Sequence, residues 1–407
     1  MAQIRPFRGV RPGPGLAAEV LAPPYDVLSE AEAREIVARL PRSFLRVTRP
    51  EVGLPEGSNA HGAEAYALAR ESLDAMRADG TLVRDGEPSF YLYGQHMGEH
   101  RQLGLMALCS VDEYDAGDIK KHEFTRPDKE QDRVDHMRAL GAQVGLVFLA
   151  YRQTEALASL LAWPGAAPDF DVTTDDGVRH ALWQVTGAQR DALTAAFADV
   201  PALYIADGHH RSAAASRNAA QLAGERGDGD GSHRWFITGI FPDDQLQVMA
   251  YNRLVADLNG RSAEDLRAAI GEHYEVSGAD SGEVPARGEV RMYLDGRWWS
   301  LKRRSHLEVA DPVNNLDVAA LQDRVLAPLL GIADPRRDTR IQFVGGIRGT
   351  DALAAAVDDG RAAVAFSLFP TGLDELFQVA DAGQVMPPKS TWFEPKLRGG
   401  VVINILD

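Results

Sequence analysis

Apolar and polar residues repeat along this chain with a helical period in some segments and as short apolar runs in others. A helix is expected from Ser29, because Glu32 completes a capping-box spacing and Pro41 ends the pattern. A second helix is expected over 61–78, with Gly80 just beyond it. Apolar runs predict strands over residues 88–97, 104–114, 144–151, 180–185, 202–206 and 235–241. The first two runs are expected to pair in an antiparallel hairpin through the turn 98–102, and the polar run 224–233 predicts a flexible loop.

A different section follows a break near 255–262. Its pattern predicts helices over 262–274, 317–331, 350–360 and 371–383, and strands within 289–304 and over 341–346 and 362–369. The strand–helix–strand order at its end predicts that the last two strands pair in parallel.

The alternation of short strands with alanine-rich helices predicts an α/β or α+β protein. A length of 407 residues suggests two or three domains. We expect a first domain over 1–255, a second α/β domain over 256–385, and a segment 386–407 that returns to the first domain.

Composition narrows the function classes. The net charge is −16, with 59 acidic and 43 basic residues, so a broad basic surface for nucleic acid is not expected. One cysteine excludes a disulfide framework and a cysteine-based metal site. Neither an apolar signal segment at the start nor a run long enough to cross a bilayer is present, which predicts a cytoplasmic protein without a membrane partner.

The most informative run joins an apolar strand to an alanine-rich helix through Asp207, Gly208, His209, His210 and Arg211. The start of a helix offers backbone amides and a positive dipole to an anion, and glycine permits a close approach. Arginine suits phosphate oxygens, histidine donates hydrogen bonds or moves protons, and aspartate can hold Mg²⁺ or act as a base. The run therefore predicts an anion site, although plain helix capping is the alternative.

A second charged run spans 119–133. Thr125 is expected to cap a helix that ends before Gly141, with Lys129, Arg133 and His136 as a cationic stripe on one face. A solvated helix face is the alternative. Glu123 lies before the cap and is a candidate general base, or else a structural ion pair.

Two proline-containing runs are less specific. The extended run 386–396 would present Lys389 and Lys396 to a cleft, or serve as a rigid connector. The arginine-rich start and the run 23–26 are interpreted as an edge strand without a function. The chain contains neither a P-loop nor a dinucleotide-binding glycine motif, and no zinc-peptidase or serine-hydrolase motif.

Six of these runs together resemble a bacterial and archaeal family known as domain of unknown function family 1015. They are IRPFRGVRP (4–12), APPYDV (22–27), IKKHEFTRPDKEQDR (119–133), LYIADGHHR (203–211), YNRLV (251–255) and MPPKSTWFEPKL (386–397). The resemblance covers nearly the whole chain. The family is associated with serine biosynthesis through gene neighbourhood, which implies serine or phosphoserine as substrate.

The DGHHR run is also similar to the phosphate-binding turn of the ParB/sulfiredoxin superfamily, which includes ParB-like kinases of free serine. This local resemblance implies a ParB-like nucleotide-binding core, a nucleotide phosphate on Gly208 to Arg211, and a metal or hydroxyl near Asp207. Glu123 is assigned by its chemistry, since the resemblance gives no counterpart for the catalytic glutamate of those kinases.

The leading hypothesis is phosphoryl transfer between a nucleotide, ATP or ADP, and free serine. Asp207 would hold Mg²⁺, Glu123 would take the hydroxyl proton, and Lys129, Arg133 or Lys389 would stabilise the developing charge. Two alternatives stay open. One is phosphoserine hydrolysis with His209 or His210 as nucleophile or acid, and the other is a nucleotide-binding regulator without turnover. A homodimer is compatible with all three hypotheses.

Overall fold

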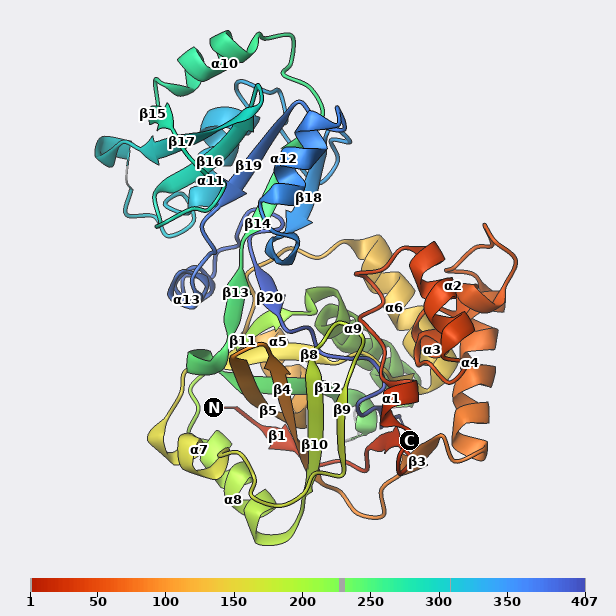
Figure 1. Ribbon diagram of the computed structural model, residues 1–407. Helices are drawn as coiled ribbons and strands as arrows, with labels where there is room; N and C mark the ends of the chain where they lie inside the picture. Colours follow the sequence, from red (N-terminus) through yellow and green to blue (C-terminus); the bar gives the residue numbers. More distant parts are fainter. Residues whose placement is uncertain (1, 227–230, 308, 407) are drawn as a thin grey trace. The chain divides into compact units, whose positions relative to one another are not determined.

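The computed structural model describes residues 2–226, 231–307 and 309–406, and contacts divide the chain into two compact units (Figure 1). The first unit comprises Met1–Lys121, Thr125–Leu246 and Pro395–Asp407, and the second comprises His122–Phe124 and Gln247–Glu394. The main boundaries between the two units lie at 246/247 and 394/395. The sequence predicts domain boundaries at 255/256 and 385/386.

A nine-stranded mixed sheet forms the centre of the first unit, in the order β6-β11-β8-β12-β5-β4-β10-β9, with β1 paired to β5. Its strands are β1 (Ile4–Arg5), β4 (Phe90–Met97), β5 (His100–Ser110), β6 (Ile119–Lys120), β8 (Val147–Tyr151), β9 (Phe170–Thr173), β10 (Arg179–Val185), β11 (Leu203–Asp207) and β12 (Trp235–Pro242). Two small sheets join β2 (Val10–Pro12) to β3 (Leu82–Arg84), and β7 (Ala142–Gln143) to β21 (Asn404–Ile405).

Helices flank this sheet. They are α1 (Ala17–Val20), α2 (Glu30–Arg39), α3 (Leu45–Thr48), α4 (Ala63–Ala78), α5 (Val111–Ala116), α6 (Pro127–Leu140), α7 (Glu155–Leu160), α8 (Gly187–Phe197) and α9 (His209–Arg226). Short 3₁₀ turns occupy Pro50–Gly53, Ser232–Arg234 and Asp243–Gln245. Leu105, Leu149 and Ile205 are fully buried, so the central strands carry the main hydrophobic core.

The second unit contains a six-stranded sheet in the order β15-β17-β16-β19-β14-β18. Its strands are β14 (Tyr251–Val255), β15 (Tyr274–Gly278), β16 (Glu289–Leu294), β17 (Arg297–Arg303), β18 (Ile341–Gly345) and β19 (Val364–Leu368). The strands β13 (Gln247–Met249) and β20 (Trp392–Glu394) pair with each other. The helices are α10 (Ala263–Ile270), α11 (Asp317–Leu321) with a π turn over Gln322–Leu326, α12 (Asp351–Asp358) and α13 (Leu373–Asp381), with 3₁₀ turns at Ser305–Leu307 and Gly346–Arg348.

The mixed α/β class is confirmed, but the parallel pairing predicted in the second section is wrong. Both β18 and β19 pair antiparallel with β14, which lies between them. The two strands therefore run in the same direction without pairing with each other. The intervening strand comes from far earlier in the sequence, so the local order of elements did not reveal it.

Some local predictions for the first unit are confirmed, and others differ from the structure. The Ser29 capping box is confirmed: the Ser29 hydroxyl accepts from the Glu32 amide and the Glu32 carboxylate accepts from the Ser29 amide. The hairpin is antiparallel, but its turn is only Gly98–Glu99, and the run after Ser110 is the helix α5 instead of strand. The predicted loop 224–233 overlaps the end of α9 and a 3₁₀ turn, and its residues 227–230 lie outside the described residues.

Among the described residues, no helix combines the length and the apolar character needed to cross a membrane.

Candidate functional site

The turn between β11 and α9 places a glycine where other residues would be strained. Gly208 has φ +99°, a backbone conformation that side chains disfavour. A Cβ there would lie 3.2 Å from the Arg211 Nε and 3.4 Å from the Val147 Cα. The Gly208 carbonyl accepts hydrogen bonds from the amides of Arg211 (2.9 Å) and Ser212 (3.0 Å). The chain therefore passes directly from a buried strand into the positive end of α9.

Asp207, the last residue of β11, is an ionised carboxylate between two cations. Its Oδ2 lies 3.3 Å from the Lys396 Nζ and 3.7 Å from the Arg211 Nη2. Burial alone would raise the pKa of Asp207, but Lys396 and Arg211 together hold it well below its usual value. A carboxylate with so low a pKa is a weak proton acceptor, which favours an electrostatic role for Asp207 over that of a base.

Arg211 lies along the segment before β8. Its Nη1 donates to the Leu146 carbonyl, and a Cβ at Gly145 would be only 3.0 Å from the Arg211 Cδ. Asp207 and the exposed Asp26 raise the pKa of Arg211 against the effect of burial, so the guanidinium is a fixed positive charge.

A pocket of about 510 Å³, its open mouth included, runs beside Arg211. It is lined by α6, α9, the segment before β8 and the start of β12. The lining residues are Tyr25, Thr48, Arg133, His136, Met137, Ala142, Gln143, Val144, Gly145, Val147, Arg211, Ala215, Phe236 and Ile237. Two arginines and a tyrosine thus share the pocket with a largely apolar wall, an arrangement suited to a ligand with an anionic end and a flat apolar end.

Arg133 is the second cation of this pocket. Its guanidinium lies 4.3 Å from the centre of the Tyr25 ring and forms an ion pair with Asp132. Burial alone would lower the pKa of Arg133, but Tyr25 and Asp132 raise it. Arg133 is therefore positively charged at the pocket, with its side chain mostly covered.

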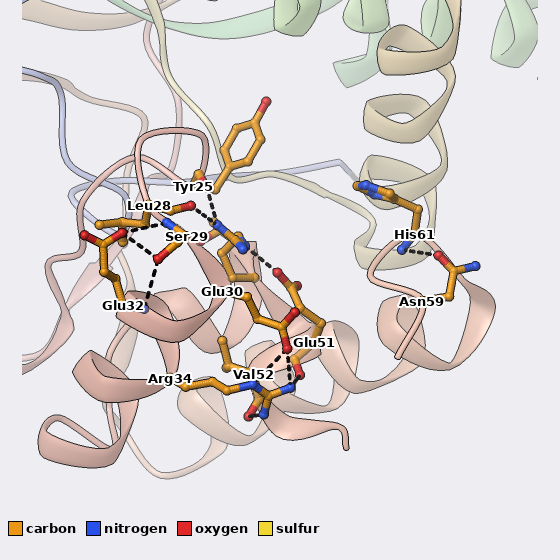
Figure 2. Close-up of polar contacts among 12 residues, drawn as sticks. Tyr25, Leu28, Ser29, Glu30, Glu32, Arg34, Glu51, Val52, Asn59 and His61 are labelled. Carbon is orange, nitrogen blue, oxygen red and sulfur yellow. Dashed lines mark hydrogen bonds and ion pairs between the residues drawn. The ribbon is translucent and has the colours of Figure 1, made fainter. Parts of the chain in front are cut away.

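Figure 2 shows polar contacts at the backbone of Tyr25 and Leu28, and Arg49 is the donor in these contacts. The Arg49 Nη1 donates to the carbonyls of Tyr25 (2.8 Å) and Leu28 (2.8 Å), and its Nε donates to Glu51. In the same view the Tyr25 ring points away from these contacts. Sequence reasoning had interpreted the run 23–26 as an edge strand without a function and thus missed Tyr25, although the run belongs to the family resemblance.

The two histidines of the turn are buried or half-buried. His209 is buried and adds to the lowering of the Asp207 pKa. The His210 Nε2 accepts a hydrogen bond of 3.1 Å from the Arg126 amide, at the start of α6. This contact gives His210 a structural role in joining α9 to α6.

The structure of α6 differs in two details from the helix that the sequence predicts. Its N-cap is Arg126, with Pro127 at the first position, and the Thr125 hydroxyl instead donates to Glu130. His136 is buried, its Nε2 donates to the Val47 carbonyl at 2.9 Å, and burial together with Arg133 lowers its pKa to about 4. His136 is therefore neutral and the predicted three-cation stripe is wrong, whereas Lys129 is exposed and Arg133 lines the pocket.

Glu123 and Lys389 belong to the second unit. Glu123 is half-buried and follows His122, whose carbonyl accepts a 2.8 Å hydrogen bond from the Met386 amide. Lys389 has φ +60°, which is unusual for a residue with a side chain, and its carbonyl accepts from the Arg253 Nη2 at 3.0 Å. Of the site residues predicted from the sequence, Asp207, Gly208, Arg211 and Arg133 thus lie together within the first unit.

The surroundings of Asp207 do not fit a resident metal ion. In the described part of the chain, no group of three or more His, Cys, Asp or Glu side chains is arranged to hold one. Asp207 faces Lys396 and Arg211, which already balance its charge. Since Mg²⁺ is often bound through one or two carboxylates plus substrate phosphates, any magnesium here is expected to arrive with a nucleotide.

Comparisons with known proteins place the sequence in context. A family model described as protein of unknown function DUF1015 matches residues 4–319, while no curated protein matches the sequence significantly. Similar solved structures include a free serine kinase in complex with AMP, at 12% identity and a TM-score of 0.36, covering 74% of this chain and 91% of that one. Others are SbnI with a C-terminal truncation from Staphylococcus aureus (13%, 0.39, 73% and 85%) and a conserved hypothetical protein from Pyrococcus furiosus (14%, 0.36, 74% and 95%).

Proposed function

This chain belongs to the DUF1015 family of proteins of unknown function, and we propose that it binds ATP or ADP and transfers a phosphoryl group to free serine. One observation carries the proposal. The guanidinium groups of Arg133 and Arg211 share a pocket of about 510 Å³ with an apolar wall, next to the start of α9.

The two ends of this pocket match the two ends of a nucleotide. Arg133, Arg211 and the positive end of α9 suit phosphate oxygens, because guanidinium groups bind them through paired hydrogen bonds. Val144, Phe236 and Ile237 offer an apolar surface for a base. Tyr25 holds Arg133 by a cation–π contact, so one arginine is already oriented before a ligand arrives.

Serine is the finer part of the proposal and rests on the resemblance of the run 203–211 to the turn of ParB-like serine kinases. In the proposed step the serine Oγ attacks the terminal phosphorus, and an O–P bond forms as the bond to the bridging oxygen breaks. The shortened nucleotide leaves with that electron pair, and a carboxylate accepts the hydroxyl proton. Lys396 keeps Asp207 ionised, so Asp207 orients Arg211 through their ion pair.

Glu123 remains our proposed proton acceptor. Glu123→Gln is expected to keep nucleotide binding and to lose turnover. Equal turnover in the variant and the parent protein would remove Glu123 from the mechanism.

A pair of matched variants tests the pocket. Arg211→Gln and Arg133→Gln should each weaken ATP or ADP binding by about 10- to 100-fold in calorimetric titrations, since each removes a charge-assisted contact to phosphate. Arg217→Gln and Arg138→Gln are the controls, because these arginines lie on the same two helices and pair with Glu130 and Glu225 instead. Unchanged affinity in both pocket variants would contradict the proposal.

Measurements of turnover distinguish the kinase from the phosphatase and from the regulator. Nucleotide consumption that depends on free serine and yields phosphoserine supports the kinase. Phosphate release from phosphoserine without nucleotide would establish the phosphatase instead, and tight nucleotide binding without either reaction would establish a regulator.

A further inference from the structure

A row of three polar side chains crosses the main sheet of the first unit, on β10, β4 and β5. His180 lies directly opposite Gln95, and Gln95 lies directly opposite Gln102, so the three side chains share one face of the sheet. None of the three is exposed to solvent. Burying polar side chains costs free energy unless hydrogen bonds offset the cost, so the partners of this row are informative.

The amide of Gln95 binds the main chain of residue 396. Its Nε2 donates to the Lys396 carbonyl at 2.9 Å, and the Gln102 Nε2 donates to the Gln95 Oε1 at 2.8 Å. Because its oxygen accepts from Gln102, the Gln95 amide presents its nitrogen to Lys396. The two glutamines therefore act together on one carbonyl that is about 300 residues further along the chain.

His180, at the other end of the row, binds the same segment two residues later. Its Nε2 accepts from the Arg398 Nε at 3.3 Å, and its Nδ1 lies 2.7 Å from the Tyr93 hydroxyl. Burial and Arg398 lower the pKa of His180 to about 3, so the ring is neutral and can accept from the guanidinium. The Arg398 Nη2 also donates to the Thr174 Oγ1 at 3.0 Å. The segment is thus fixed through the main chain at 396 and through the side chain at 398.

The Lys396 side chain extends from this fixed segment to the turn at the start of α9. Its Nζ lies 3.3 Å from the Asp207 Oδ2, and the same oxygen lies 3.7 Å from the Arg211 Nη2. A lysine side chain loses much conformational freedom when its ammonium group is held in one place. Fixing the main chain of Lys396 leaves only the side chain to be ordered beside Asp207.

We propose that Gln95 and Gln102 are positioning residues of the nucleotide site, which fix Lys396 so that its ammonium group stays beside Asp207 and Asp207 keeps Arg211 in place. Neither glutamine belongs to the pocket lining, so each acts through Lys396. Their effect on nucleotide rests on the proposed function, whereas their effect on the position of Lys396 does not.

The position of Lys396 is tested without nucleotide, by acetic anhydride labelling of the full chain and mass spectrometry. Gln95→Met keeps the length of the side chain and removes the amide. Lys396 should then be acetylated several-fold faster than in the parent, while the exposed Lys302 is acetylated at the parent rate. Gln184→Met is the matched control, because the Gln184 Nε2 on β10 donates to the Ser89 Oγ at 2.8 Å instead. Equal Lys396 labelling in Gln95→Met and the parent overturns the proposal.

A double-mutant cycle with Lys396→Met tests whether the glutamines act on nucleotide through Lys396. In calorimetric titrations with ADP, Gln95→Met should weaken binding by about 3- to 10-fold in the parent protein. In the Lys396→Met protein it should cause no further loss, because the positioned group is already absent. Equal losses in both backgrounds would show a general structural role and overturn the proposal, as would unchanged affinity in Gln95→Met.

Gln102→Met is the second variant, in case Gln95→Met does not fold. It leaves the Gln95 amide in place and removes its donor, so Lys396 labelling should rise by a smaller factor. Unchanged labelling in a folded Gln102→Met protein overturns the proposal as well. A parent protein that binds neither ATP nor ADP would refute the proposed function, and the labelling would still decide whether Gln95 positions Lys396.

Discussion

At the scale of single residues, Gly208 affects both the backbone conformation of the turn and the position of the Arg211 side chain. Its φ of +99° is accessible to glycine and strained for any residue with a Cβ. The same Cβ would approach the Arg211 Nε at 3.2 Å, within the range where one group must shift. A change at this position therefore acts on the backbone and on the pocket cation together.

Gly208→Ala is expected to destabilise the protein by about 1–3 kcal/mol and to weaken nucleotide binding. Urea unfolding and calorimetric titration measure the two effects. Gly224→Ala is the control, because Gly224 lies within α9 with open space around it, and alanine there should be neutral or stabilising. Parent-like stability and affinity in Gly208→Ala would show that the turn tolerates a side chain.

His136 makes the stability of the first unit sensitive to acid. Burial lowers its pKa to about 4, below the usual 6.5, so the folded state prefers the neutral ring. The unfolded state therefore binds the proton more readily, and the stabilisation present above pH 6.5 is lost as the pH falls towards 4.

The expected loss is at most about 3 kcal/mol from this residue. His136→Gln retains a donor for the Val47 carbonyl and should show a flatter dependence of the urea midpoint on pH between 7 and 4. Identical profiles for the variant and the parent would mean that His136 already titrates normally.

At the scale of elements, the Arg49 contacts position Tyr25 for the pocket. One guanidinium joins the carbonyls of residues 25 and 28 to the segment after α3 (Figure 2). Because the Tyr25 ring in turn contacts Arg133, the contacts connect a loop to the helix α6.

Arg49→Met should therefore weaken nucleotide binding although Arg49 does not line the pocket. We expect a fall of several-fold in affinity and a destabilisation of about 1.5–3 kcal/mol, since charged hydrogen bonds are lost. Arg34→Met is the control, because Arg34 holds α2 to the carbonyls of Glu51 and Val52 without touching the Tyr25 backbone. Equal loss of affinity in both variants would point to general loosening instead.

Structural features that depend on residues close together in the chain could be predicted from the sequence. The Ser29 cap, the glycine turn at 208 and the end of α6 at Gly141 each depend on neighbouring residues. The pairing of β18 and β19 was predicted incorrectly because β14, about 90 residues earlier, lies between them.

The residues of the candidate site also differ in whether the sequence could predict them. Asp207 to Arg211 form one continuous run and were found as a pattern. Lys396 reaches Asp207 from 189 residues away, and Tyr25 meets Arg133 from a run that is distant from α6 in the sequence. Such contacts depend on the tertiary fold, which composition and spacing do not encode directly.

At the scale of the whole molecule, His136 in the first unit and Asp317 in the second contribute to the pH dependence of stability with opposite signs. Asp317 in the second unit is buried, and its carboxylate accepts from the Gly288 amide through both oxygens at 3.0 and 2.9 Å. Burial nevertheless raises its pKa to about 6. The folded state thus binds this proton more tightly than the unfolded chain, so stability falls as the pH rises from about 4 to 6.

Asp317→Asn should remove the free-energy cost of burying an ionised carboxylate and stabilise the protein at pH 7.5 by about 1–3 kcal/mol. Hydrogen exchange at the amides of β16 and β17 measures the change within the second unit. The variant should match the parent near pH 4, where the parent carboxyl is protonated as well. A destabilised variant at pH 7.5 would show that the ionised carboxylate is favourable there.

The first unit is assembled from separated stretches of chain, with Gln247–Glu394 intervening before its last residues. Those residues supply Lys396 for Asp207, and strand β21 for β7. All residues of the second unit therefore precede, in the sequence, the residues that close the first unit. A chain that ended at residue 394 would contain every residue of the second unit but would lack the strand that pairs with β7 and the cation beside Asp207, so only the first unit would be left incomplete.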